Sequence, residues 1–302
     1  MRVVHSKNRK STRIDTDIAE LLREVSAKNL REHVEMLAFP RHYVAERKAN
    51  LRARDLLLQR LRGFGFSPRL QGSYDNIVVT SNCDIDGAFL LFGAHYDSVP
   101  GTPGADDNAS AVAVCLECAR LIEANGIDSI MIVLFNREED GLLGSSEFVA
   151  DLVGQSDITV EEAHIFEMVG YTSRAPGSQK LPPGLPGVTA PDVGDFLALL
   201  ANRQSNAIAE NLLQLTASYV PQSPVIALKI YLGIEKYFGH LNRSDHAPFW
   251  KAGIPSIMWT DTSEFRNPHY HRVSDTADTL DYDFISQVTK LALARAASRA
   301  WQ

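Results

Sequence analysis

Residues 88–97 read AFLLFGAHYD, an apolar run that turns polar at His95. A continuous apolar run of this length, lying between Gly87 and a polar loop, is typical of a β-strand buried on both faces. Residues 129–136 and 163–167 show the same pattern later in the chain. Strands buried on both faces occur mainly in sheets that helices cover on each side, so these three segments predict an α/β fold.

Segments with helical spacing of apolar residues alternate with the predicted strands. We expect helices at residues 14–37, 49–61, 110–124, 145–152, 203–217, 244–251 and 283–301, and further strands at 76–80, 196–200 and 254–259. This alternation predicts a three-layer α/β/α sandwich around a central mixed, largely parallel sheet. Because no linker or repeat divides the pattern, we predict one domain over residues 14–302, preceded by a basic, flexible tail over residues 1–13.

Composition argues against several classes of protein. The 302 residues are 45% hydrophobic, and 30 basic against 37 acidic residues give a formal net charge of −7. No long run of Lys or Arg occurs outside residues 1–13, which argues against a nucleic-acid partner. No apolar run reaches the roughly 18 residues of a membrane span, and the N-terminus has no hydrophobic signal segment. The sequence as given predicts a cytoplasmic protein, with a signal removed beforehand as the alternative.

Acidic side chains and one histidine gather where the predicted strands end. The carboxyl ends of parallel strands meet at one edge of a sheet, and ligands of open α/β sheets bind there. Residues 104–110 add two more acids, in the loop that precedes the helix predicted at 110–124. The side chains expected at this edge are His95, Asp97, Asp106, Asp107, Glu138, Glu139 and Glu167.

The predicted cluster contains many carboxylates and few cations, since only Arg137 lies among them. Carboxylates held together without cations repel one another, so either protons or a metal ion must neutralise them. Imidazole and carboxylate ligands together suit Zn²⁺, and also Mn²⁺ or Co²⁺. A later histidine, for which we favour His271, would complete two sites that share one bridging carboxylate. Each acid taken alone is more often a helix cap or a loop charge, so the hypothesis depends on their occurring together.

Five segments carry a more specific signal. They read GAHYDS at 93–98, GADDNAS at 104–110, EEDGLLGS at 138–145, SDH at 244–246 and HRVSDT at 271–276. In this order they resemble metallopeptidase family twenty-eight, the co-catalytic zinc aminopeptidases, over roughly residues 30–300. Relatives in that superfamily include glutamate carboxypeptidases, glutaminyl cyclases and a non-catalytic receptor ectodomain. The resemblance implies a zinc-dependent exopeptidase fold, with residues 14–302 as the catalytic domain.

The resemblance also implies two zinc ions and their ligands. Asp107 would bridge both ions, with His95 and Glu167 on one of them. Glu139 and His271 would bind the other ion. Glu167 departs from the family pattern, because this position is usually Asp and the additional methylene lengthens the reach of the carboxylate.

Three further positions are implied to act beside the metals. Glu138 would be the general base, and Asp97 would orient the imidazole of His95. A second donor to the developing oxyanion is needed, and we favour Tyr270 because it adjoins the histidine ligand in sequence. The alternative tyrosines are Tyr231 and Tyr237.

Several polar residues near the motifs are predicted to have other roles. Asp106 precedes the bridging acid and is expected to be structural. Ser244 is expected to be the N-cap of the helix at 244–251, and His246 to form a hydrogen bond near the site. His269 is the alternative to His271 as a metal ligand.

The resemblance implies hydrolysis of a peptide bond at a chain terminus, which we predict to be aminopeptidase activity on peptide or aminoacyl substrates. The alternatives are a glutaminyl cyclase or another zinc amidohydrolase, a carboxypeptidase, and a non-catalytic binding module. Cyclases of this fold have a Trp-rich pocket, whereas this chain has three tryptophans.

Residues 174–194, rich in Pro and Gly, would either form a wall of the substrate cleft or cover the surface. The oligomeric state is left open. A carboxypeptidase would need a cation for the terminal carboxylate, from among Arg174, Lys180 and Arg243.

Overall fold

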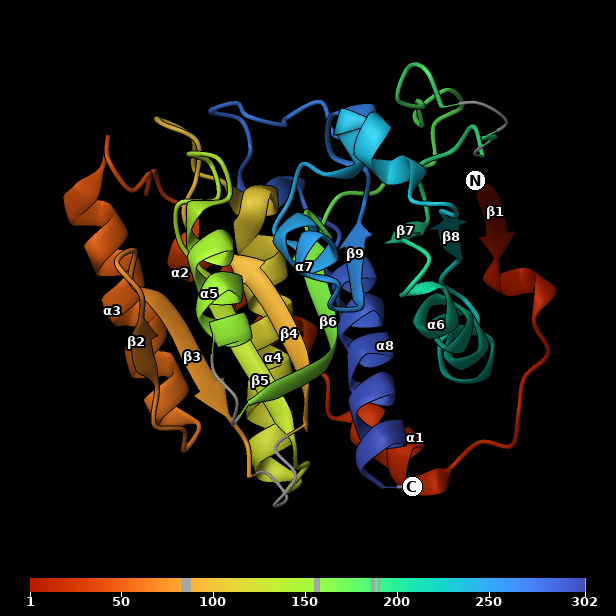
Figure 1. Cartoon of the computed structure of the whole chain (residues 1–302), viewed down its shortest axis with the longest axis horizontal. Helices are drawn as coiled ribbons and strands as arrows, with labels where there is room; N and C mark the ends of the chain where they lie inside the picture. Colours follow the sequence, from red (N-terminus) through yellow and green to blue (C-terminus); the bar gives the residue numbers. More distant parts are fainter. Residues whose placement is uncertain (83–87, 155–157, 186–187, 190, 302) are drawn as a thin grey trace.

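Strand β4 lies inside a nine-stranded sheet in the computed structural model, which describes residues 1–82, 88–154, 158–185, 188–189 and 191–301 (Figure 1). The strands are β1 (Arg2–His5), β2 (Arg69–Gln71), β3 (Asn76–Thr80), β4 (Ala88–His95), β5 (Ile130–Phe135), β6 (Thr159–Glu167), β7 (Leu197–Ala201), β8 (Val225–Lys229) and β9 (Ser256–Thr260). The α-helices are α1 (Thr16–Arg23), α2 (Ala27–Leu37), α3 (Arg47–Gly63), α4 (Ala111–Ala124), α5 (Leu143–Gly154), α6 (Asn206–Tyr219), α7 (His246–Ala252) and α8 (Tyr282–Ala300).

The sheet is mixed, and its central strands are parallel. The strand order is β1-β8-β7-β9-β6-β4-β5-β3-β2. Strands β9, β6, β4 and β5 run parallel, whereas β7 joins β9, and β3 joins β5, in antiparallel register. Strand β5 reads IMIVLF and is buried along its whole length, as expected for a parallel strand covered on both faces. The predicted α/β fold with a mixed sheet and a parallel centre is confirmed.

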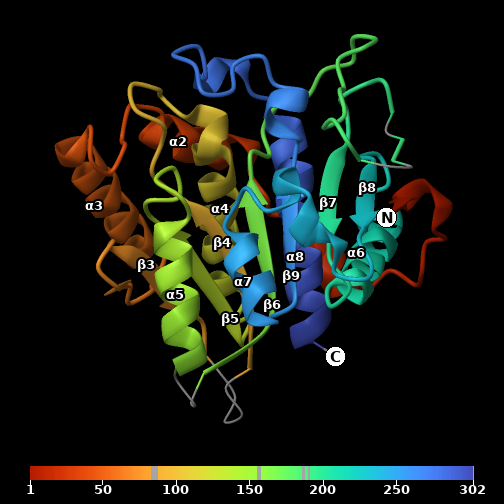
Figure 2. The same cartoon turned by 45° about the horizontal axis from the view of Figure 1, so that its top comes forward.

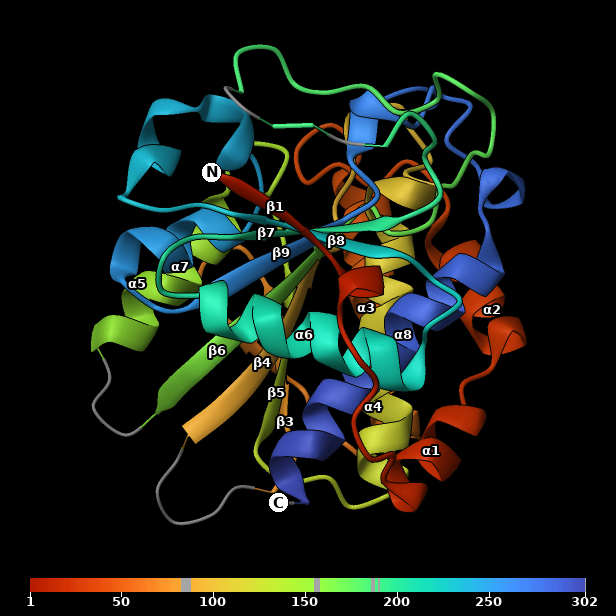
Figure 3. The same cartoon turned by 90° about the vertical axis from the view of Figure 1, so that its right-hand side faces the viewer.

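Helices cover both faces of the sheet, as Figures 2 and 3 show. Helix α4 packs against α2, α3 and α8, and these helices share one apolar core with α1 and α6. On the opposite face α5 and α7 contact each other, and α7 also contacts β6 and β9. This arrangement leaves the carboxyl ends of the parallel strands at one rim of the sheet.

Some elements differ from those predicted. The helix predicted over residues 14–37 is two helices, because Asp15 caps α1 and Ser26 caps α2 by accepting backbone amides. Strand β6 begins at Thr159, earlier than the predicted residues 163–167. Strands β2 and β8 were not predicted, since each is short and lies at or next to a sheet edge. Within the described ranges, no helix is long and apolar enough to cross a bilayer.

The segment expected to be a flexible tail, residues 1–13, is instead attached to the domain. Residues Arg2–His5 pair with β8 in antiparallel register and form the edge strand of the sheet. Further along, the amide of Thr12 donates to Ser218 Oγ at 3.0 Å. The prediction of a flexible tail is wrong for Arg2–His5. Val3 and the valine after it are β-branched and suit pairing with an open sheet edge, but the surrounding basic residues led us to expect a solvated segment.

Candidate metal centre

Parallel strands bring the predicted ligands to one rim of the sheet. His95 ends β4, Glu167 ends β6, and Glu139 follows β5. His95 Nε2 lies 3.4 Å from Glu167 Oε2 and 3.4 Å from Asp107 Oδ1. One potential ligand atom from each of these three residues lies within 4.8 Å of the other two. Their mutual distances allow one metal ion to contact all three side chains.

A second group forms around the other oxygen of Asp107. Its Oδ2 lies 3.1 Å from His271 Nε2, and that nitrogen lies 3.8 Å from Glu139 Oε2. The potential ligand atoms of these three residues also lie within 4.8 Å of one another. Asp107 therefore faces both groups with one carboxylate oxygen each, which is the arrangement that a bridging ligand needs.

Buried atoms without partners make the groups suited to a metal ion. Both ring nitrogens of His95 and Oε1 of Glu139 are buried and make no hydrogen bond to any residue that the structure describes. An unsatisfied buried polar atom costs about 1–3 kcal/mol, so native proteins normally provide a partner for it. Imidazole nitrogens and carboxylate oxygens are ligands of zinc. The side chains around Asp107 therefore fit zinc.

Burial and crowding shift the pKa values of this cluster. Burial lowers the pKa of His95, but the carboxylates around it, led by Glu167 and Glu138, raise that pKa well above its usual value. Burial raises the pKa of Glu138, and the carboxylates of Glu139 and Glu167 raise it further, against the opposing effect of His95. Although burial opposes it, the nearby imidazoles of His271 and His95 hold the pKa of Asp107 well below its usual range. Acids crowded in this way are stabilised by a bound cation.

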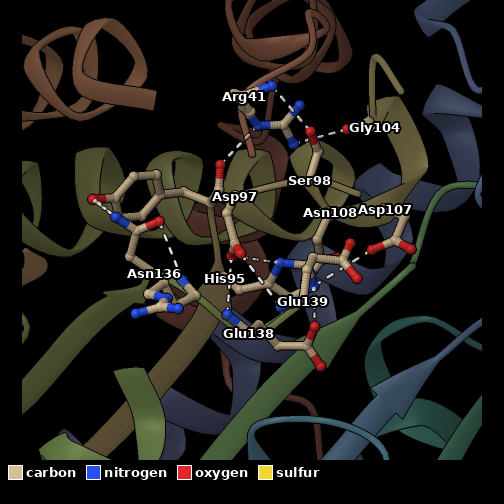
Figure 4. Close-up of polar contacts among 12 residues, drawn as sticks. Arg41, His95, Asp97, Ser98, Gly104, Asp107, Asn108, Asn136, Glu138 and Glu139 are labelled. Carbon is tan, nitrogen blue, oxygen red and sulfur yellow. Dashed lines mark hydrogen bonds and ion pairs between the residues drawn. The ribbon is translucent and has the colours of Figure 1, made fainter. Parts of the chain in front are cut away.

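Asp97 connects the end of β4 to the turn after β5. Its Oδ1 and Oδ2 accept the backbone amides of Glu138 and Glu139 at 3.2 and 3.3 Å (Figure 4). Oδ1 also lies 3.3 Å from Nδ1 of His95. This buried carboxylate thus links the imidazole to the Glu138–Glu139 turn, from the position where an orienting residue is expected.

Backbone contacts hold the loop that carries Asp107. Its amide donates to Asp275 Oδ2 at 3.1 Å, and the amide of Asp106 donates to Oδ1 of the same residue at 2.8 Å. Gly104 has a φ of 58°, and a Cβ there would lie 2.3 Å from the Asp107 carbonyl oxygen, so the turn requires glycine. The Asp106 side chain accepts the Gly170 amide at 2.9 Å, which agrees with the structural role expected of it.

Three other polar residues can be compared with their predicted roles. Ser244 is not the N-cap of α7, because it lies one residue too early in the chain. Its Oγ instead donates to Oε2 of Glu167 at 2.7 Å, and so holds the longer carboxylate that departs from the family pattern. The His246 ring contacts a backbone carbonyl oxygen at 2.9 Å. His269 Nδ1 lies 3.0 Å from a serine hydroxyl, and His269 belongs to neither ligand group.

Arg41 is a buried residue of the centre that no motif indicated. Its side chain is fully buried and donates to the backbone carbonyls of Tyr96 at 2.7 Å, Leu37 at 2.8 Å and Gly104 at 2.9 Å (Figure 4). It therefore joins the end of α2 to the loop after β4 and to the loop before Asp107. Burial lowers the pKa of Arg41 to about 10, so the guanidinium stays charged at neutral pH beside the acids.

Replacing Arg41 by Met is expected to lower the free energy of unfolding by about 3–5 kcal/mol, because several buried carbonyl groups would lose their donor and each such loss costs about 1–3 kcal/mol. Arg41→Lys should recover part of the loss, because it restores the charge but not the planar set of donors. Urea unfolding of the metal-free protein measures both changes. Arg47→Met is the control, because the Arg47 side chain is 41% exposed and its ion pair with Asp75 should contribute less than about 1 kcal/mol. Equal losses for the two Met variants would contradict the role given to Arg41.

A cavity of about 420 Å³ opens beside the ligand groups. Asp107, Glu139, Glu167 and His271 line its polar end. The Pro- and Gly-rich segment supplies Leu181, Pro182 and Leu185 to its wall, which supports the cleft-wall hypothesis for that segment. None of the described residues that line the cavity is a tryptophan.

Tyr270 lies at the polar end of the cavity, next to a predicted ligand. Its ring stacks on the imidazole of His271 with 3.7 Å between ring centroids. Its hydroxyl oxygen accepts a hydrogen bond from Arg243 Nη2 at 2.8 Å. Tyr231 and Tyr237 are 37% and 74% exposed and are not among the described residues that line the cavity. Of the three candidate oxyanion donors, the structure brings only Tyr270 to the cavity.

Similar proteins are known. A family model described as peptidase family M28 matches residues 76–296. YfbL, an uncharacterized protein of Escherichia coli, is 36% identical over 233 residues, which are 73% of this chain and 70% of YfbL. The aminopeptidase YwaD of Bacillus subtilis is 32% identical over 206 residues, which are 67% of this chain but only 39% of YwaD.

Solved structures share the fold. The LapA aminopeptidase of Legionella pneumophila has a TM-score of 0.76 at 21% identity, and the match covers 96% of this chain and 78% of LapA. BSAP, a zinc aminopeptidase from Bacillus subtilis, has a TM-score of 0.54 at 26% identity, over 74% of this chain and 50% of BSAP. The region that matches the family model contains every motif of the metal centre. The chain belongs to peptidase family M28.

Proposed function

We propose that this chain is a zinc aminopeptidase that removes the first residue of a peptide, with two zinc ions sharing Asp107. The observation that carries the proposal is that Asp107 presents one oxygen to each of two ligand groups. A carboxylate between two such groups suits a two-metal hydrolytic site. The aminopeptidase YwaD and the zinc aminopeptidase BSAP support the same activity and the same metal.

Glu138 is the residue to which we assign the proton transfer during hydrolysis. When bound, zinc would lower the pKa of a water molecule and polarise the scissile carbonyl. The Oε2 atom of Glu138 lies 3.9 Å from His95 Nε2. Glu138 forms a third possible ligand group with His95 and Glu139, but it belongs to neither of the two groups that share Asp107. It would accept one proton as the water oxygen bonds to the carbonyl carbon. It would then give that proton to the amine nitrogen as the C–N bond breaks.

The charges around the cavity favour a free amine over a free carboxylate. Glu138 lines the cavity and is not a proposed zinc ligand, so its carboxylate can attract a protonated amino group when zinc neutralises the ligand carboxylates. Of the cations considered for a carboxypeptidase, Arg174 does not line the cavity, and Arg243 forms an ion pair with Glu264. This leaves Lys180, whose position in the cavity lining gives the carboxypeptidase alternative its remaining support. The absence of tryptophan among the described lining residues likewise disfavours the cyclase alternative.

Cleavage of aminoacyl 4-nitroanilides tests the proposal. The zinc-loaded protein should release 4-nitroaniline from leucyl 4-nitroanilide, and a chelator should stop the reaction until zinc is restored. N-acetylation of the same substrate should abolish cleavage, because it removes the amino group that the cavity is proposed to bind. Ring closure of an N-terminal glutaminyl residue, release of residues from the carboxyl end, or tight peptide binding without turnover would each favour one of the alternatives instead.

Tyr270→Phe is expected to lower kcat by about 10²–10³-fold, as is usual when one oxyanion donor is removed. KM should change little, because the ring that stacks on His271 is retained. Steady-state kinetics with leucyl 4-nitroanilide measures both parameters. Tyr237→Phe serves as the control and should leave them unchanged, since Tyr237 is 74% exposed. A Tyr270→Phe variant with normal kcat would show that the oxyanion donor lies elsewhere.

A further inference from the structure

The cavity extends from the metal centre to the edge of the sheet. Helix α7 contacts β6 and β9. Next to β6, strands β9, β7, β8 and β1 lie side by side towards the edge of the sheet (Figure 3). Residues of all four strands line the cavity and form what we call its floor. The apolar floor side chains are Val3, Ala198, Leu200, Ile226, Leu228 and Met258.

The floor is built by alternate residues of the strands. Ile226 and Leu228 line the cavity, whereas Ala227 between them belongs to the core on the opposite face. Strand β7 shows the same alternation, with Leu199 in that core. Successive side chains of a strand point to opposite faces, so one whole face of the sheet forms the floor. A floor of paired strands holds its shape better than a loop would, and it therefore fixes the length of the cavity.

The floor is longer than a common amino-acid side chain. Neighbouring strands lie about 4.8 Å apart, so the three intervals from β9 to β1 cover about 14 Å. The cavity measures about 420 Å³. By comparison, a cavity of about 150 Å³ lined by apolar side chains accommodates benzene. Even with its polar end occupied by the reacting groups, the cavity has room for an apolar group larger than the side chain of leucine.

Val3 forms the far end of this floor. It packs against the apolar cluster of Phe196, Ala198 and Ile226, and β1 holds it opposite Leu228. The residues on either side of Val3 point to the other face of the sheet, because side chains alternate along a strand. Val4 belongs to the apolar core on that face, and Arg2 is exposed. The edge strand therefore contributes one side chain to the cavity, at the point where the floor ends.

We infer that the cavity binds a long apolar side chain on the first residue of the substrate, and that Val3 sets the upper limit of its length. The inference rests on the proposed aminopeptidase activity and adds the substrate class to it. That class is amides and peptides whose first residue carries a straight aliphatic or bulky aromatic side chain longer than that of leucine. Each methylene buried along the floor should raise kcat/KM about fourfold, until the group reaches Val3.

A series of 4-nitroanilides of straight-chain amino acids, from 2-aminobutanoic to 2-aminodecanoic acid, tests the inference. In the unaltered protein, kcat/KM should rise beyond the leucyl substrate. Val3→Trp should reduce it more than tenfold for the longest side chains and leave the alanyl substrate unchanged. Val3→Ala should shift the optimum to longer side chains. Arg2→Trp adds the same bulk on the opposite face of the strand and should alter nothing.

Calorimetry of the same straight-chain amino acids, as free compounds, binding to the zinc-loaded protein gives a dissociation constant that does not depend on turnover. The affinity should follow the same order of chain length and the same response to the Val3 variants. If no anilide is cleaved, the proposed activity fails, and the binding series still decides whether the cavity takes long side chains. An optimum at leucine, or an optimum that neither Val3→Trp nor Val3→Ala shifts, would overturn the inference.

Discussion

Glu138→Gln is expected to lower kcat by about 10²–10⁴-fold while the amount of bound zinc stays unchanged. Glutamine has nearly the same shape as glutamate but cannot accept the proton of the attacking water. Glu138 could join His95 and Glu139 in a ligand group, but it belongs to neither of the two groups that share Asp107. Under the proposed assignment it is not a zinc ligand, so its charge is not expected to be needed for binding the metals. The backbone amide of residue 138 would still donate to Asp97, so the turn should keep its position.

The neighbouring variant Glu139→Gln is the matched control for this prediction. It changes the next residue of the same turn in the same way, but it alters a proposed zinc ligand, so bound metal should fall along with activity. Kinetics and metal analysis of both purified variants separate the two roles. A Glu138→Gln variant that keeps full kcat, or one that loses its zinc, would refute the assignment of Glu138 as the general base.

Asp107→Asn is expected to weaken the binding of both zinc ions by more than 100-fold and to abolish measurable activity. The amide keeps one oxygen but loses the negative charge that each ligand group shares. The loss should exceed the 10–100-fold that is typical when a residue behind the ligands is changed. Calorimetric zinc titration at constant pH measures the affinity and the number of ions bound.

Asp140→Asn is a suitable control for Asp107→Asn. Asp140 is a nearby acid that pairs with Arg137 and belongs to none of the ligand groups found among the described residues. Its replacement should leave zinc affinity and stoichiometry unchanged. Retention of two zinc ions by Asp107→Asn would disprove the bridging role, and loss of one ion alone would show that Asp107 belongs to a single site.

The residues at strand ends could be predicted because a local pattern reports their position. An apolar run ending in a polar residue marks the carboxyl end of a buried strand, and parallel packing then brings His95 and Glu167 to the same rim. Short-range sequence patterns and one rule of sheet topology were therefore sufficient to predict that these residues gather at one rim. The separate roles expected of Asp97, Glu138 and Glu139 came from the family resemblance, because a place at the end of a strand does not distinguish a ligand from a base.

Residues that act through distant contacts could not be predicted. Arg41 follows a helix at a position with no motif, and its role appears only when three separate segments place carbonyl groups around it. Ser244 looked like a helix cap, whereas its hydroxyl contacts Glu167, which lies 77 residues away in the chain. Strand β1 escaped prediction because four residues carry little periodicity. Its assignment depends on β8, whose open edge is visible only in the folded chain.

The cavity is lined both by residues at strand ends and by residues whose position depends on contacts that are distant in sequence. Its polar end was predictable from the motifs, but its apolar floor comes from strands that are distant in sequence, including β1. Substrate selectivity is therefore expected to depend on residues such as Val3 that carry no catalytic motif. The chemistry and the selectivity of this chain would then be specified by different parts of the sequence.

The central claim is that two zinc ions share the carboxylate of Asp107. Anomalous X-ray diffraction at the zinc edge, on crystals of the zinc-loaded protein, tests it most directly. We expect two peaks, each about 2.0–2.2 Å from a different oxygen of Asp107. A single peak, or two peaks of which either lies out of bonding distance of Asp107, would contradict the account.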